Sequence, residues 1–285
     1  MHGSSRLPLT ARPLESRPRS ARAASLAWPA VGHTRVWYPE SMLAAVTFDY
    51  WNTLFVDTCG REREHRRVAI LREEVGRVAP EPSTAAVNDA LQCGYDLFDR
   101  LWIHEHRTPL CVETVDGILA ALRVRLPADA QERIVTQFEQ LILEFPPEPM
   151  PGALYALPAL AERYRLAVIC DTGYSPGLVL RELMERNGML KYFRYLYFSD
   201  EHGVSKPEAS VFVRTLGELG ARAGEAAHVG DIQRTDIAGA QGAGMAAVLF
   251  VAANDHDARS TTADLVVRHF DELPAALGSL TCAGC

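Results

Sequence analysis

The 285-residue sequence contains no run of about eighteen apolar residues, the length that a membrane-spanning helix needs. It also lacks an excess of basic residues, since its formal net charge is −7. Nucleic acids and anionic membrane surfaces bind clusters of Lys and Arg, so neither is an expected partner. The 48% hydrophobic content can bury a sizeable core, so we expect a globular protein of unknown oligomeric state.

The N-terminal segment has its own composition. Residues 1–41 hold six Arg, no Lys and two acidic residues, without helical or strand periodicity. We expect a disordered or spurious leader before a functional start at Met42, although an organelle transit peptide has the same composition. Six scattered cysteines without a recognisable secretory signal favour reduced thiols and a cytoplasmic location. The terminal Cys-Ala-Gly-Cys (282–285) is expected to be a flexible tail.

From Met42 on, short apolar runs rich in branched residues alternate with segments of helical length. Near-continuous apolar strands separated by helices are typical of a parallel sheet covered on both faces. We therefore predict an α/β fold with a Rossmann-like doubly wound parallel sheet. The predicted strands are 43–48, 166–170, 195–199, 226–230, 246–251 and 264–267. The predicted helices between them are 176–187, 207–219, 235–243 and 270–279, with Pro207 in a first helical turn.

One long segment, residues 57–148, contains no convincing strand and no Lys. Its apolar residues recur at three-to-four spacing, which predicts an all-helical domain inserted into an α/β domain of residues 42–56 and 149–281. The loop 56–60 and the Pro-rich return 146–152 suit the two halves of a hinge. The four predicted helices lie within 61–79, 83–107, 111–126 and 128–145.

Polar side chains follow the predicted strands at their carboxyl ends, where ligands bind in an open parallel sheet. The converging carboxylates would repel one another without a cation, and oxygen ligands beside a Lys suit Mg²⁺ and a phosphate group. Asp49 would then be the nucleophile that forms an acyl-phosphate. The residues at these strand ends are Asp49, Thr53, Cys170, Asp171, Thr172, Lys206, Asp231 and Asp236.

Four segments in order along the chain support this interpretation: "DYWNT" (49–53), "LAVICDTG" (166–173), "GVSKPEASVF" (203–212) and "HVGDIQRTDIAGAQGAGM" (228–245). With these motifs, the chain resembles the haloacid dehalogenase-like (HAD) hydrolase superfamily from about Met42 to its last helix. The resemblance implies a hydrolase with a helical cap, Mg²⁺ as cofactor and a small phosphorylated metabolite as substrate.

The resemblance also implies roles for individual residues. Asp49 would be the nucleophile, and Lys206 would hold the phosphate and the Asp49 carboxylate. The expected metal ligands are Asp49, the backbone carbonyl of Trp51, Asp231 and Asp236. The expected phosphate-binding residues are Thr53, Cys170, Asp171, Thr172 and Lys206.

Two positions depart from the family pattern. Trp51 stands where most family phosphatases place a second aspartate, which protonates the leaving alcohol and later activates water. An indole can do neither, and the lost proton transfer is usually worth about 10²–10⁴ in rate. Trp51 is expected to pack against the cap, with a stacking wall for an aromatic or sugar substrate as the alternative. Cys170 replaces a Ser or Thr, and Thr172 or backbone amides are candidates for part of its role.

Three functions stay open at this point. A phosphatase is favoured, and Asp236 suits metal support as well as a helix N-cap. Carbon–halogen or carbon–phosphorus cleavage is an alternative because relatives with that chemistry also lack the second aspartate, but the acidic fourth motif and the absence of Lys in 57–148 argue against it. The third is a phosphate- or partner-binding protein with little catalysis.

Overall fold

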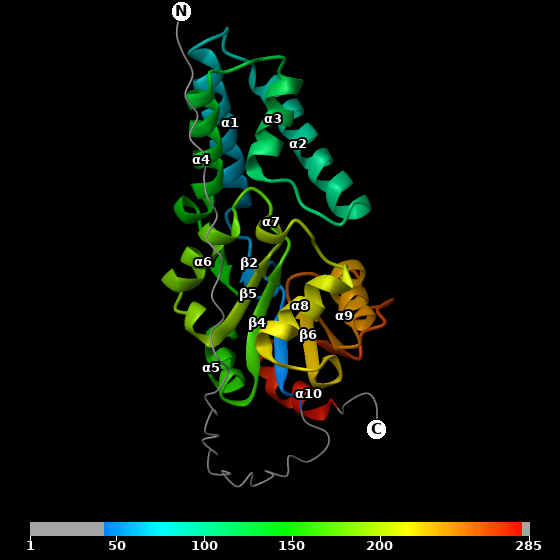
Figure 1. Ribbon diagram of the computed structural model, residues 1–285. Coiled ribbons are helices and arrows are strands. Elements are labelled where there is room, and N and C mark those ends of the chain that lie inside the picture. Colours follow the sequence, from blue (N-terminus) through cyan, green and yellow to red (C-terminus); the bar gives the residue numbers. More distant parts are fainter. Residues whose placement is uncertain (1–42, 281–285) are drawn as a thin grey trace, which may run out of the picture. The chain divides into compact units, whose positions relative to one another are not determined.

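The computed structural model of the chain describes residues 43–280. A six-stranded parallel sheet lies at its centre, in the order β5-β4-β1-β6-β7-β8 (Figure 1). The predicted α/β fold with a parallel sheet is confirmed. The predicted leader (1–41) and tail (282–285) lie outside the described residues. The strands are β1 (Ala45–Phe48), β4 (Arg165–Cys170), β5 (Phe193–Phe198), β6 (Ala226–Gly230), β7 (Ala246–Phe250) and β8 (Leu265–Val267).

Side chains of the strands alternate between two apolar cores, one on each face of the sheet. Val46 and Phe48 of β1 join the larger core together with Cys170 of β4. Ala45 and Ile169, which point the other way, join the smaller core. Because both faces are covered, each strand appears in the sequence as a continuous apolar run.

Helices cover both faces of the sheet, as a doubly wound fold requires. The larger core is covered by α5 (Ala153–Arg163), α6 (Gly177–Arg186) and α10 (Leu273–Ser279), and the smaller core by α8 (Ala209–Leu219) and α9 (Ala238–Gly242). The short helical segments are α7 (Ser199–His202), η1 (Leu190–Tyr192), η2 (Ala223–Glu225), η4 (Phe270–Glu272) and the π-helical turn η3 (Gln233–Ile237).

Helix α5 was not predicted from the sequence. It follows the Pro-rich segment and contains Pro158, and both features argue against a helix. Pro158 removes the hydrogen bond that the carbonyl of Leu154 would otherwise accept. Leu154 is 44% exposed, so water can satisfy that carbonyl, and the apolar side of α5 still packs on the sheet.

The segment between β2 (Phe55–Val56) and β3 (Glu148–Pro149) forms four helices with a core of their own, called here the helical insert (Figure 1). The two strands pair antiparallel where the chain enters and leaves the insert. No strand was expected in 57–148, and β3 begins at its last residue. Two-residue strands are too short to show periodicity. The helices are α1 (Gly60–Gly76), α2 (Thr84–His104), α3 (Cys111–Ala121) and α4 (Ala128–Glu144).

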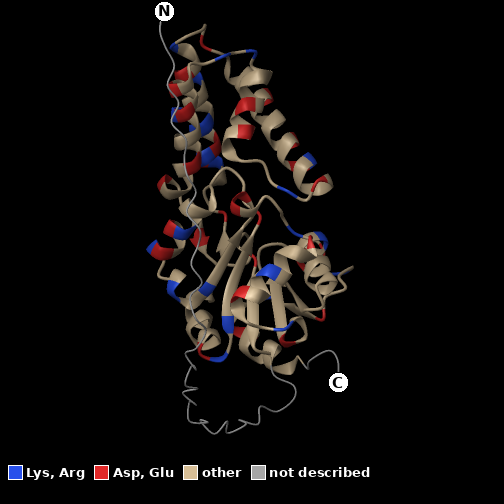
Figure 2. Cartoon of the chain, in the orientation of Figure 1, with Lys and Arg blue, Asp and Glu red and all other residues tan. Residues whose placement is uncertain are grey.

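Among the described residues, no helix has both the length and the apolar composition that crossing a bilayer requires. Lys and Arg are interspersed with Asp and Glu on the helices, without one large patch of either sign in the view shown (Figure 2).

Candidate active site

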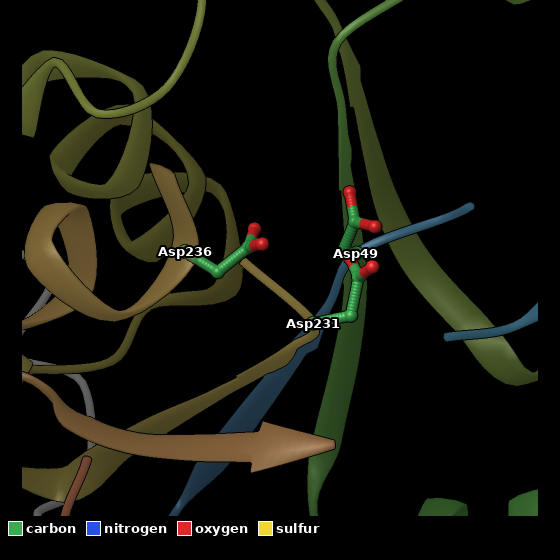
Figure 3. A group of neighbouring side chains, drawn as sticks. All are labelled: Asp49, Asp231 and Asp236. Carbon is green, nitrogen blue, oxygen red and sulfur yellow. The ribbon is translucent and has the colours of Figure 1, made fainter. Parts of the chain in front are cut away.

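Three aspartates meet at the carboxyl ends of β1 and β6. Asp49 follows β1, Asp231 follows β6, and Asp236 lies in η3 (Figure 3). One oxygen from each lies within 4.8 Å of the others, and all three residues are buried. Because β1 and β6 are adjacent and parallel, their carboxyl ends share one edge of the sheet, which brings these distant residues together.

Lys206 joins two members of this cluster. Its Nζ donates to Asp49 Oδ1 and, at 2.7 Å, to Asp236 Oδ1. Burial alone would lower the pKa of Lys206, but Asp236 and Asp49 raise it well above its ordinary value, so the amine is charged. Pro207 lies in the loop before α8, so its predicted place in a helical turn is wrong. The loop is held because the backbone N–H of Lys206 donates to Asp171 Oδ1 at 3.0 Å.

Asp236 makes the most hydrogen bonds of the three aspartates. Its Oδ1 also lies 3.1 Å from His228 Nε2, and its Oδ2 accepts from the backbone N–H of Ile232 at 3.0 Å. Burial alone would raise the pKa of Asp236, but Lys206 and His228 bring it below its ordinary value. Ile232 is the N-cap of the π-helical turn, so the N-cap role expected for Asp236 is wrong. Turns of this kind often occur at functional sites.

His228 was not predicted as a site residue. It is fully buried in β6, between Asp236 and Thr47, whose Oγ1 lies 2.7 Å from His228 Nδ1. Burial lowers the pKa of His228 although Asp236 opposes the shift, so the ring is neutral at pH 7. With Nε2–H donating to Asp236, Nδ1 accepts from the Thr47 hydroxyl. The signal in the sequence was a polar residue within an apolar strand.

Two amides hold Asp231. Nδ2 of Asn52 and Nδ2 of Asn254 each donate to Asp231 Oδ2 at 3.2 Å. Asn52 has a φ of 55°, a left-handed conformation that Asn adopts more readily than most residues. Burial and Asp236 raise the pKa of Asp231 to about 6, although the amides and Lys206 lower it. Neither Asn was predicted as a site residue.

The cluster holds more negative than positive charge. Burial raises the pKa of Asp49 most, Lys206 opposes the shift, and Asp236 and Asp231 raise the pKa further. Three carboxyl groups around one ammonium group therefore favour an added proton or a bound cation. In residues 43–280, these three aspartates are the group of acidic, His and Cys side chains whose spacing suits a metal ion.

The residues expected to bind phosphate differ in their partners. Cys170 is fully buried, and burial raises the pKa of its thiol well above the ordinary value. Thr172 Oγ1 lies 3.0 Å from Ser199 Oγ and accepts from the backbone N–H of Asp200 at 3.2 Å. Thr53 Oγ1 is buried and has no hydrogen-bond partner among the described residues. Its hydroxyl group is therefore free to bind a ligand.

A cavity of about 370 Å³ lies beside Trp51, between the edge of the sheet and the helical insert. The rings of Trp51 and Tyr50 pack edge to face, with centroids 5.3 Å apart, so Trp51 both packs and forms part of the wall. The residues that line the cavity from the core are Trp51, Asp171, Gly173, Tyr174 and Ser175. Those that line it from the insert and its entrance are Asp57, Gly60, Arg63, Arg67, Tyr95, Phe98 and Ile142.

This site and fold define a class of enzyme. The haloacid dehalogenase-like hydrolase family matches residues 43–244, and the chain belongs to this family. The resemblance inferred from the four motifs is thereby confirmed.

Similar curated proteins are phosphatases. Ribulose-1,5-bisphosphate 5-phosphatase of Halopiger xanaduensis is 37% identical over 133 residues, which cover 46% of this chain and 55% of that protein. The pyrimidine 5'-nucleotidase YjjG of Escherichia coli is 34% identical over 99 residues, which cover 34% of this chain and 43% of that protein. Glyceraldehyde 3-phosphate phosphatase of Methanopyrus kandleri is 30% identical over 130 residues (45% and 51%). The chain thus spans about half the length of the curated relatives it matches.

Solved structures of the family share the fold. An HAD phosphatase from Thermococcus onnurineus superposes with a TM-score of 0.56 at 22% identity, covering 84% of this chain and 99% of that one. A 2-haloacid dehalogenase from Pseudomonas syringae pv. Tomato superposes with a TM-score of 0.57 at 23% identity, covering 83% of this chain and 99% of that one. Since both chemistries occur on this fold, the site residues must distinguish between them.

Proposed function

We propose that this chain is a Mg²⁺-dependent phosphohydrolase that acts on a small phosphorylated metabolite through an aspartyl-phosphate at Asp49. The observation that carries the proposal is the buried cluster of Asp49, Asp231 and Asp236 around the ammonium group of Lys206. A phosphoryl group needs positive charge around its oxygens and an attacking oxygen in line with the leaving group. Lys206 and a cation supply the charge, and Asp49 supplies the oxygen.

The donor set fits a hard cation. Among the described residues, Asp49 Oδ2 and Asp231 Oδ1 accept no hydrogen bond, whereas both oxygens of Asp236 do. Asp49, Asp231 and the backbone carbonyl of Trp51 would therefore hold Mg²⁺, and Asp236 would support it by holding Lys206. When bound, Mg²⁺ would neutralise charge on the transferring phosphoryl group.

The remaining residues act on the phosphate group. The free hydroxyl of Thr53 would donate to a phosphate oxygen, and the Lys206 ammonium group would neutralise another. Cys170 is buried in the core with a neutral thiol, and Thr172 is bonded to Ser199. We therefore propose Thr53 and Lys206 as the main phosphate-binding side chains.

The substrate must fit the cavity beside Trp51. Its volume of about 370 Å³ lies at the small end of the range for ligand pockets, and its walls carry aromatic rings and two arginines, Arg63 and Arg67. The three similar phosphatases are named for small phosphorylated metabolites. The helical insert would act as the cap over this cavity. Free thiols at Cys59, Cys93, Cys111 and Cys170 suit the proposed cytoplasmic location.

Two alternatives make different use of the same site. A dehalogenase also works with an aspartate nucleophile, and the fold is shared with a 2-haloacid dehalogenase. A metal-free reaction, however, has little use for the surplus of buried carboxylates. A binding protein with little catalysis would retain the cluster without turning over its ligand.

The first prediction concerns metal dependence. Wild-type protein with Mg²⁺ should hydrolyse acetyl phosphate and 4-nitrophenyl phosphate, whose leaving groups need no acid, and EDTA should suppress both reactions. Released phosphate is the measurement. Halide release from 2-haloacids without phosphate release would support the dehalogenase alternative. Calorimetric binding of phosphorylated ligands without turnover would support the binding protein.

The pH dependence of metal binding gives a second prediction. Asp231 must lose its proton to bind a cation, and burial beside Asp236 raises its pKa to about 6. The apparent affinity for Mg²⁺ should therefore fall by at least about tenfold per pH unit below pH 6. Calorimetry across this range measures it. Asp49, the other carboxylate ligand, also has a raised pKa, so Asp231→Asn should bind weakly with a shallower pH dependence. An equally steep step in that variant would contradict the assignment.

Close packing at Gly230 gives a third prediction. A Cβ atom there would lie 2.4 Å from Asp236 Cγ, so Gly230→Ala must displace the Asp236 carboxylate. Misplacing a group that supports the site by about 1 Å can cost about 10²-fold in rate, and we expect a loss of that order in kcat/KM for 4-nitrophenyl phosphate. Gly242→Ala is the matched control, since nothing lies within 4 Å of its Cβ position. Equal activity of the two variants would contradict the role of Asp236.

A further inference from the structure

The cavity beside Trp51 contains carboxyl groups that could replace the missing acid. Two acidic residues line it, Asp57 and Asp171. Asp57 already has partners: Arg63 Nη2 lies 2.5 Å from Asp57 Oδ2, and the backbone N–H of Cys59 donates to Asp57 Oδ1 at 3.2 Å. Asp57 is thus paired with a cation. Asp171 instead accepts from two neutral N–H groups, the Trp102 indole and the Lys206 backbone, so it is the candidate for proton transfer.

Asp171 lies at the end of β4, beside the end of β1. Phe48 and Val168 are register partners, so Asp171 follows the pair by three residues on β4, as Trp51 does on β1. Asp171 Oδ1 accepts from the backbone N–H of Lys206, whose Nζ contacts the proposed nucleophile. The carboxyl group thus lies on the strand next to the one that carries the usual acid, and it shares a partner with the nucleophile.

The helical insert holds the other oxygen of this group. Trp102 Nε1, from α2, donates to Asp171 Oδ2 at 2.8 Å. The guanidinium carbon of Arg234 lies 4.1 Å from the centroid of the Trp102 ring, on which it stacks. Trp102 is therefore a positioning residue, because its indole N–H fixes how the Asp171 carboxyl group is oriented when the insert is docked.

The charge of Asp171 matters for its role. A carboxylate here would repel a phosphate group, so the phosphate-binding role expected from the sequence is unfavourable, whereas a protonated carboxyl group can donate. Burial raises the pKa of Asp171, Lys206 and Trp102 oppose the shift, and Asp236 adds to it. Arg234 is a further charged neighbour.

We propose that Asp171 performs the proton transfers that Trp51 cannot, an inference that rests on the proposed phosphohydrolase function. An Asp49 oxygen bonds to phosphorus, the bond from phosphorus to the leaving oxygen breaks, and Asp171 gives its proton to that oxygen. A water oxygen then bonds to phosphorus, the bond from phosphorus to Asp49 breaks, and Asp171 takes the proton of the water. The sum is phosphate ester plus water giving alcohol plus inorganic phosphate.

Asp171→Asn tests this role with two substrates of one shape. Phenyl phosphate has a leaving group that needs protonation, and 4-nitrophenyl phosphate has one that does not. We expect kcat/KM for phenyl phosphate to fall about 10²–10⁴-fold and that for 4-nitrophenyl phosphate to change by less than about tenfold. With 4-nitrophenyl phosphate, one equivalent of nitrophenol should appear in a burst before slow turnover, because the second step also lacks its base.

A double variant and the wild type complete the experiment. Trp51→Asp combined with Asp171→Asn should recover phenyl phosphate hydrolysis at least about tenfold over Asp171→Asn alone. Equal losses for both substrates would show that Asp171 acts in binding or structure and would overturn the proposal, as would no loss for either. If the wild type hydrolyses neither substrate nor acetyl phosphate, the proposed function itself fails. The role of Asp171 alone is overturned by a different result. In that case the wild type hydrolyses acetyl phosphate and 4-nitrophenyl phosphate, but Asp171→Asn loses none of the wild-type activity on phenyl phosphate.

Discussion

Asp49→Asn is expected to abolish phosphate release from every substrate that the wild type hydrolyses, a loss of about 10⁴–10⁶-fold in kcat. Asp49 is the attacking oxygen of the proposed mechanism, and the amide of Asn is not a nucleophile at neutral pH. The burst of nitrophenol should disappear together with steady turnover. Rapid-mixing kinetics with 4-nitrophenyl phosphate measures both.

Folding of this variant provides the control. Asp49 contributes one of three buried carboxyl groups that lie within 4.8 Å of one another, so removing its charge relieves repulsion. The variant should therefore unfold at a temperature no lower than that of the wild type. A folded variant that keeps more than about a tenth of wild-type kcat would rule out the aspartyl-phosphate at this position.

Lys206→Met should have the largest effect on stability. Its ammonium group is buried and contacts Asp49 and Asp236, and these carboxylates would lose the cation that compensates their burial. Removing one partner of a buried ion pair typically costs about 3–5 kcal/mol in the free energy of unfolding, and we expect a cost of this size in EDTA at pH 7. Activity should be lost as well, because in the proposed mechanism Lys206 would also neutralise the phosphate group.

The pH and metal dependence of this cost make the prediction specific. Without Lys206, the folded-state pKa values of the carboxyl groups rise, so the groups are neutral at low pH and the cost shrinks toward about pH 4–5. Saturating Mg²⁺ should recover part of the stability at pH 7 by replacing the lost positive charge. Urea unfolding at pH 7 and at about pH 4–5, with and without Mg²⁺, measures the free energy of unfolding under each condition.

The sequence offers a matched control for this experiment. Lys191 is the only other lysine of the chain, and it is exposed. Lys191→Met removes the same charge and should leave the free energy of unfolding nearly unchanged. Similar costs for the two variants, or a Lys206→Met cost that does not depend on pH, would contradict the buried ion cluster.

Local patterns were sufficient to predict the sheet. Continuous apolar runs mark strands that are buried on both faces, and the helices between them require parallel strands. Helix α5 was missed because Pro158 and the preceding prolines resemble a break between helices. The carbonyl that Pro158 leaves unbonded belongs to Leu154, an exposed residue, so water can satisfy it. The expected N-cap role of Asp236 is wrong because a π-helical turn already begins three residues earlier, at Gln233.

The sequence by itself determined the class of the protein and the identity of the central aspartates. Parallel strands end at a common edge, so Asp49, Asp231 and Asp236 are predicted to lie at the same edge of the sheet. They meet there because β1 and β6 are adjacent. The sequence also predicts that Trp51 occupies the position where most phosphatases of the family have an acid.

Only the tertiary structure decided which partners these residues have. His228 beneath Asp236 and Trp102 on Asp171 come from segments far apart in the chain, and their hydrogen bonds depend on how the strands and the helical insert pack. Packing also places the Thr172 hydroxyl within hydrogen-bonding distance of Ser199. The Thr53 hydroxyl, in contrast, has no hydrogen-bond partner among the described residues. A pattern of residue types cannot specify such bonds, because a side chain takes whichever partner the folded chain brings within about 3 Å.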